Sequence, residues 1–291
     1  VKTATGTFAG TCRSLIEWST LTGQTYIGLG TEKKYYVLYN GSYIDITPVV
    51  RTVTLAANQM SATNGSTRVY IRDVDNECVV GDYVTISGAT TFAGIPAGDL
   101  NKEQTVVTVT NLTKVLGATD MSATNGSQNL VITWANNNLS VGHYVTITGG
   151  TGFAGIPSGD INTTHVITAV ATNTITVVVA TAATSTTTGG GAATLTVNDV
   201  GINVATAATS TAVGGGTPTL AYQLSVGLDT VVDGPGWGAG PWGGPVTDAY
   251  PAGVGWGESY GDITITQQLR LWTNDNYGQD LIINPRGGGI Y

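Results

Sequence analysis

The sequence has 291 residues, of which 10% are charged and 8% aromatic, with 41 glycines and a formal net charge of −8. This charge argues against wrapping of a nucleic-acid backbone, which needs a basic surface that releases counterions. No apolar run reaches the roughly 18 residues of a membrane span. Abundant Thr, Val, Ala and Gly indicate β-structure with tight turns. Cys12 and Cys78 lack metal-ligand spacing and are expected to be free thiols, as in a protein assembled in a reducing cytoplasm.

The first segment, residues 14–48, predicts a meander of short strands. Asn40-Gly41 is a strong hairpin signal, because both central residues of a type I′ turn need positive φ. Pro48 then ends the sheet pattern. The four expected strands are Leu15–Trp18, Thr25–Gly28, Lys34–Tyr39 and Ser42–Ile46.

The middle of the chain contains a duplication at an offset of 61 residues. Met60-Ser-Ala-Thr-Asn-Gly-Ser66 returns unchanged as Met121-Ser-Ala-Thr-Asn-Gly-Ser127, and Phe92-Ala-Gly-Ile-Pro96 returns as residues 153–157. Beyond residue 101 the register is interpreted as slipping by one, so that Val106 matches Val166. Both copies repeat one programme of β-branched segments, which predicts two tandem β-barrel or β-sandwich modules, 53–116 and 117–179.

A shorter echo follows at residues 180–217. Ala180-Thr-Ala-Ala-Thr-Ser-Thr186 recurs as residues 205–211, and each copy precedes a glycine triplet. This composition suits either a flexible linker or a repeated hairpin. The hairpin is preferred, because residues 194–197 and 219–222 supply a strand after each triplet.

Residues 233–261 are rich in Gly, Pro and Trp. Trp237, Trp242 and Trp256 lie here in a sequence with no regular period. We expect a loop with packed indoles, because three exposed indoles would leave much apolar surface in water. The three tryptophans are the interaction candidates of the chain. Structural packing or a subunit contact is favoured over stacking on sugars.

The last segment, residues 263–291, returns to strand and echoes the first. Trp18 is followed by Gly23-Gln24 as Trp272 is followed by Gly278-Gln279, with one residue inserted. The expected fold is therefore all-β: a propeller-like or multi-sheet body formed by residues 1–52 and 218–291, with the duplicated modules inserted between its parts.

Candidate catalytic and ligand-binding residues are weak in this sequence. His143 and His165 lack a nearby nucleophile motif and are interpreted as surface histidines. The loops with Asp99 and Asn101, repeated at residues 160 and 162, supply too few oxygens for calcium and are interpreted as turns.

Paired carboxylates that could cleave glycosides show no distinctive spacing. The acidic residues near turns are instead expected to form a solvated surface. We therefore expect no catalytic residue, no cofactor, no metal site and no enzyme. The acidic residues considered are Asp73, Asp75, Glu77, Asp229, Asp233, Asp248 and Glu258.

Several stretches resemble virion structural proteins of tailed bacteriophages, of the tail hub or nozzle type, whose propeller-like body carries small β-domain insertions. The resemblance covers about residues 14–50 and 220–291, and it covers the inserts only loosely. The stretches that carry it are Tyr26–Thr31, Tyr35–Pro48, Gly236–Gly243, Leu269–Ile282 and Asn284–Tyr291.

The resemblance implies a ring around the path by which DNA leaves the capsid. Partners would be further copies of the chain and neighbouring portal-adaptor, tail or fibre proteins, with DNA passing without specific binding. It also implies assembly in the host cytoplasm into the virion. The alternatives are a host-surface polysaccharide-binding adhesin and a capsid-decorating protein. Val1 in place of Met, and a strand beginning at Tyr291, lead us to expect a segment of a longer protein.

Overall fold

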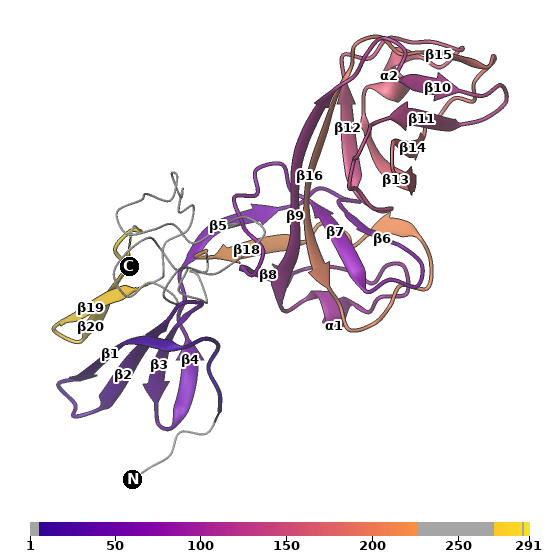
Figure 1. Ribbon diagram of the computed structural model, residues 1–291. Coiled ribbons are helices and arrows are strands. Elements are labelled where there is room, and N and C mark those ends of the chain that lie inside the picture. The colour runs from indigo at the N-terminus through magenta and orange to yellow at the C-terminus, as the bar shows by residue number, and fades with distance from the viewer. Residues whose placement is uncertain (1–5, 226–270, 287) are drawn as a thin grey trace, which may run out of the picture. The chain divides into compact units, whose positions relative to one another are not determined.

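The computed structural model describes residues 6–225, 271–286 and 288–291 (Figure 1). Within these residues it contains twenty strands and two four-residue helices, so the predicted all-β, multi-sheet fold is confirmed. Neither of these helices is long enough to cross a membrane. The chain divides into two compact units, residues 1–48 with 226–291, and residues 49–225.

The first unit contains a four-stranded antiparallel meander and a separate hairpin. Asn40 and Gly41 have φ values of 49° and 83°, which confirms the predicted turn with two positive φ angles. The strands are β1 (Cys12–Ser19), β2 (Thr25–Thr31), β3 (Tyr35–Tyr39), β4 (Ser42–Asp45), β19 (Trp272–Tyr277) and β20 (Asp280–Pro285).

Trp272 packs the hairpin against the meander. Its indole Nε1 donates to the Thr31 carbonyl at 2.6 Å, and its ring meets Tyr35 edge-on at 4.9 Å between centroids. A Cβ at Gly30 would lie 2.5 Å from the indole, so this position needs glycine. The indole therefore lies directly on the backbone of β2.

The echo between the first and last segments is only partly structural. Both Gly-Gln pairs sit at hairpin turns, but Trp18 lies opposite Tyr26 at the turn end of its hairpin. Trp272 lies opposite Pro285 at the far end of β19. The two tryptophans therefore do not occupy equivalent positions.

The second unit is formed by two related modules. The first contains β5 (Val49–Thr54), β6 (Met60–Ala62), β7 (Arg68–Arg72), β8 (Tyr83–Ser87), α1 (Ala97–Leu100) and β9 (Glu103–Val115). The second contains β10 (Met121–Ala123), β11 (Asn129–Thr133), β12 (Tyr144–Thr148), α2 (Ser158–Ile161), β13 (Thr164–Ala171), β14 (Thr174–Val178) and β15 (Thr187–Gly189). The chain continues with β16 (Thr194–Asn203), β17 (Ala212–Gly214) and β18 (Thr219–Gln223).

The two modules are nested, not tandem as predicted. After the second module, the chain returns to the first: the later part of β16 pairs with β7, β17 pairs with β6, and β18 pairs with β8 and β5. Figure 1 shows β9 and β16 as two long strands with β10 to β15 at their far end. The second module, the inner module, is thus an insertion at the tip of a hairpin of the first, the outer module.

Strand pairing shows where the insertion lies. Ile71 pairs with Val200 as Ile132 pairs with Ile175, so β9 and β16 correspond to β13 and β14. The two-residue turn that joins β13 to β14 is replaced in the first module by the whole second module. Sequence periodicity reveals the copies but not this nesting, because strand pairing over long separations leaves no local signal.

The predicted slip in the repeat register is wrong. The backbone N–H and carbonyl of Val106 pair with Asp82 and Gly81, as those of Ile167 pair with His143 and Gly142. The 61-residue offset is therefore retained through β9 and β13. Both strands carry a register irregularity directly after these residues, at equivalent positions in the two copies.

The Thr/Ala/Gly echo forms neither a hairpin of its own nor a linker. Its first half ends in β15, which pairs with β10, and its second half ends in β17, which pairs with β6. Each half therefore completes one module. The offset is 25 residues because β15, which completes the inner module, and β17, which completes the outer one in the same way, begin 25 residues apart.

Each module has its own buried core. Met60 and Met121 are both 0% exposed and lie in different clusters, each built from inward-facing Val, Ile and Leu side chains. The boundary between the units falls at residues 48 and 226 in place of 52 and 218, because β5 and β18 pair with each other.

Candidate functional site

The three tryptophans predicted as interaction candidates, Trp237, Trp242 and Trp256, lie outside the described residues. In the second unit, three features combine burial with polar or ionisable groups: a cleft in the second module, a junction between the modules, and a carboxylate cluster in the first module.

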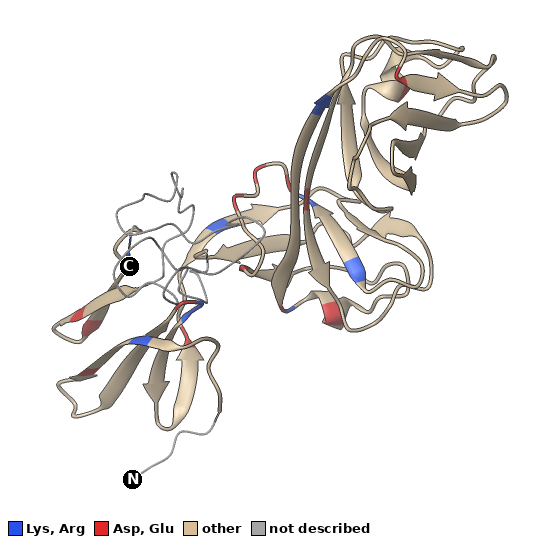
Figure 2. Ribbon diagram, in the orientation of Figure 1, with Lys and Arg blue, Asp and Glu red and all other residues tan. Residues whose placement is uncertain are grey.

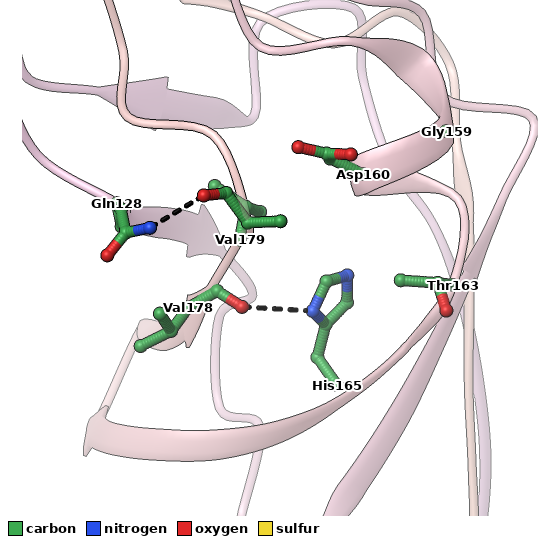
Figure 3. Close-up of a pocket in the computed structure, with 8 residues that line it drawn as sticks. Gln128, Gly159, Asp160, Thr163, His165, Val178 and Val179 are labelled. Atoms are coloured by element: carbon green, nitrogen blue, oxygen red, sulfur yellow. Dashed lines mark hydrogen bonds between the residues drawn. The ribbon is translucent and has the colours of Figure 1, made fainter.

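The cleft of the second module has a volume of about 540 Å³ (Figure 3). It lies between α2, the start of β13 and the segment that follows β14. Asp160 and His165 are the ionisable residues of its wall. The lining residues are Gln128, Gly159, Asp160, Thr163, His165, Val178, Val179 and Ala180.

His165 is buried, so its predicted surface position is wrong. Its Nδ1 lies 3.2 Å from the Val178 carbonyl and its Nε2 lies 3.1 Å from the Ile161 carbonyl. The equivalent residue of the first module is Gln104, whose amide donates to the carbonyls of Asp99 and Leu100. Both side chains therefore fasten the strand that follows the short helix.

The acidic and amide residues of the repeated loops also form internal hydrogen bonds. Asn162 accepts from the Gly150 N–H and donates to its carbonyl, both at 2.7 Å. Asp160 accepts from the Thr181 N–H at 2.9 Å. Asn101 makes the same pair of bonds to Ala89. These side chains close loops, and the described part of the chain contains no cluster of three or more His, Cys, Asp or Glu residues around a metal position.

The junction between the modules contains the second histidine. His143 is 4% exposed, against the prediction of a surface position, and its Nδ1 lies 3.1 Å from Asp199 Oδ2. Asp199 is 1% exposed and also accepts from the Tyr144 N–H at 2.7 Å. Burial raises the pKa of Asp199, although its hydrogen bond with His143 acts in the opposite direction.

The carboxylate cluster of the first module is built around Asp73. The Arg51 guanidinium donates to both oxygens of Asp73, at 2.5 and 2.7 Å, and the Tyr222 hydroxyl donates at 2.8 Å. Burial opposes ionisation, but these hydrogen bonds outweigh it and lower the pKa of Asp73. Asp73 is thus buried and paired, where the sequence predicted a solvated acid. Burial raises the pKa of Cys78, which is a free thiol, to about 12.

In all three features, the polar side chains mainly form internal hydrogen bonds that hold segments of the chain together. Within the part of the chain that the structure describes, neither imidazole is hydrogen-bonded to a serine, threonine or cysteine side chain. Sequence reasoning missed Asp199 and Arg51. A signal for Asp199 was present, because it is a lone carboxylate in an otherwise uncharged strand, Thr194–Asn203.

Comparison with known proteins gives little further information. No family model matches the chain, and no curated protein matches it. Among solved structures, the phage phi92 endosialidase aligns with a TM-score of 0.29 and 13% sequence identity, over 69% of this chain. The alignment covers 30% of that structure's chain. Similarity at this level carries no argument about fold or function.

Proposed function

We propose that the chain is a structural component of a tailed-bacteriophage virion, most specifically part of a short-tail nozzle or hub that forms a ring around the DNA exit path. In this proposal the first unit belongs to the tail body, and residues 49–225 form a decoration inserted into it. The ring is completed by further copies of the chain, and neighbouring tail, adaptor or fibre proteins contact it.

The observation that carries this proposal is the way the second unit is closed. Thr52 of β5 pairs with Ala221 of β18, so the two ends of the unit leave it as adjacent antiparallel strands. A domain whose ends lie side by side can be added at one loop of a body without opening that body. The inner module is held by the outer one in the same manner, through β9 and β16. The insertion of one module into another suits a structural protein whose role depends on the surfaces it presents to neighbouring proteins.

Two further features support the proposal. The meander β1 to β4 has the four antiparallel strands of a propeller blade, and these residues carry the resemblance to tail proteins. The inner module has very few charges (Figure 2): between residues 111 and 197 they are Lys114, Asp120 and Asp160. A nearly neutral, threonine-rich surface favours association with other proteins over colloidal repulsion.

The proposal is tested by immuno-electron microscopy of purified particles, using antibodies raised against residues 49–225. We expect labelling at the tail, below the capsid. Labelling at fibre tips would favour a polysaccharide-binding adhesin, and labelling over the capsid lattice would favour a decoration protein. Either result would overturn the nozzle role, and complete absence of label from intact and opened particles would overturn the virion role.

A further inference from the structure

The cleft of the inner module contains three polar groups that the fold does not use (Figure 3). Asp160 accepts from the Thr181 N–H through Oδ2, and its Oδ1 accepts no hydrogen bond from the described residues. Gln128 donates to the Ala180 carbonyl through its amide nitrogen, which leaves its amide oxygen without a partner among them. The Thr163 hydroxyl likewise makes no hydrogen bond within the described part of the chain. All three oxygens can accept from a ligand.

The remaining wall of the cleft adds apolar surface and no further polar side chain. Both ring nitrogens of His165 lie close to backbone carbonyls, at 3.2 and 3.1 Å, so the imidazole is already engaged. Val178, Val179 and Ala180 form the apolar side, and Val178 is 45% exposed. The volume of about 540 Å³ falls within the range of small-ligand sites, roughly 300 to 1,000 Å³. The ligand that fits has an aliphatic part and a group that donates hydrogen bonds.

The outer module carries a cation at the equivalent place. Thr163 corresponds to Lys102 at the 61-residue offset. Asp99, the counterpart of Asp160, accepts from the Thr206 N–H at 2.9 Å. That hydrogen bond and the positive charge of Lys102 both lower the pKa of Asp99. The inner module thus keeps the carboxylate and the loop that positions it, but lacks the lysine.

No other cation of the inner module replaces that lysine. Between residues 111 and 197 the charged residues are Lys114, Asp120 and Asp160, and Lys114 does not line the cleft. Asp160 has no basic partner within the described residues. A carboxylate without a counter-charge, beside an apolar wall, favours a ligand that is cationic at one end and aliphatic along its length.

The available oxygens suit an ammonium group better than a guanidinium. An arginine binds a carboxylate best through two parallel hydrogen bonds, one to each oxygen. In Asp160 the Oδ2 atom is already bonded to the Thr181 N–H, so only Oδ1 is available. A lysine ammonium has three donors that are not held in one plane, and it is carried on a four-carbon stem. One carboxylate, one amide and one hydroxyl oxygen match these donors.

We propose that the cleft of the inner module binds a lysine side chain of a neighbouring protein, whose ammonium group donates to Asp160, Gln128 and Thr163. The stem of the lysine lies against the apolar side of the cleft. The bound ammonium supplies the positive charge that Lys102 supplies in the outer module. This inference goes beyond the proposed function and does not depend on it.

The test is amide NMR of the full chain at pH 7 and constant salt, titrated with Nα-acetyl-lysine methylamide. Nα-acetyl-norleucine methylamide, which has the same four-carbon stem and no charge, is the matched probe. We expect the lysine probe to shift the signals of residues 160–165 and 178–181, with half-saturation on the order of 10 mM. The norleucine probe should bind about fivefold more weakly, since an exposed ion pair contributes little.

Three variants locate the interaction. Asp160→Asn keeps an oxygen that can accept from the Thr181 N–H but removes the charge, so the lysine probe should bind only as weakly as the norleucine probe. Asp99→Asn, the matched change in the outer module, should leave the titration unchanged. Thr163→Lys, which installs the residue of the outer module, should abolish binding because its own ammonium group fills the cleft.

Four results would overturn the proposal: equal affinity for the two probes, shifts confined to residues outside the cleft, an unchanged affinity in Asp160→Asn, or tighter binding of the corresponding arginine derivative. Putrescine separates the two sources of an alkylammonium group. If it binds more tightly than the lysine probe, the ligand is a free amine and the assignment to a lysine side chain is wrong. If Asp160→Asn does not fold, the comparison of probes on the wild-type chain decides alone.

Discussion

Met121→Ala in the inner module should destabilise the outer module as well as its own. Met121 is 0% exposed, and its sulfur lies in the core at the position that Met60 occupies in the outer module. Truncating a fully buried methionine to alanine costs about 2 to 5 kcal/mol, since it removes apolar contacts and leaves a cavity. This loss falls directly on the inner module.

The effect on the outer module follows from the nesting. While folded, the inner module holds the ends of β9 and β16 together as closely as a two-residue turn would. When it unfolds, a disordered loop of roughly 90 residues joins them instead, which corresponds to about five and a half doublings of loop length. At about 0.6 kcal/mol per doubling, the outer module loses about 3 kcal/mol of stability. The two modules should therefore unfold together.

The assay is hydrogen exchange of the full chain in increasing urea, with peptides assigned to each module. Peptides of both modules should lose protection at a shared urea midpoint, and Met121→Ala should lower that midpoint for both. Met60→Ala is the matched variant, with the same residue type, burial and repeat position. If Met121→Ala lowers the midpoint of inner-module peptides alone, the nested coupling is refuted.

Three further predictions concern single side chains. Asn162→Ala and Asn101→Ala should each destabilise their own module by about 1 to 3 kcal/mol, because each removes two hydrogen bonds to a loop; urea unfolding checks this, and a large difference between them would contradict equivalent loops. Asp73→Asn should reduce the loss of stability on acidification. The lowered pKa of Asp73 beside Arg51 adds stability above about pH 3.9, and this stability is lost as pH falls. The free energies of unfolding of the wild type and the variant should therefore differ above pH 4 and converge below it. His165→Gln, which installs the outer module's residue, should leave a folded protein with a change in melting temperature of only about 2 to 4 °C.

The sequence allows the class of the fold and the existence of the duplication to be predicted. The Asn40-Gly41 turn and the alternating β-branched segments are local signals, because turn geometry and side-chain alternation are set by neighbouring residues. The nesting of the modules depends on which later strand pairs with β9. Residues 198–203 complete the outer module after a long detour, and no nearby residue reveals that pairing.

The same limit applies to the buried polar groups. The sequence predicts surface positions for histidines without a motif, yet His143 is covered by Tyr70 and hydrogen-bonded to Asp199, which are far from it in the sequence. The sequence predicts a solvated acid at Asp73, because its partners Arg51 and Tyr222 lie 22 and 149 residues away. Partners that come from distant strands decide whether a polar residue is buried.

The most direct test of the proposed function is cryo-electron microscopy of the intact particle that contains this chain. We expect a closed ring of copies on the tail axis, with the meander of residues 12–45 in its wall and residues 49–225 as attached density. Density for the chain at fibre tips, on the capsid lattice, or in no ring about the DNA path would contradict it.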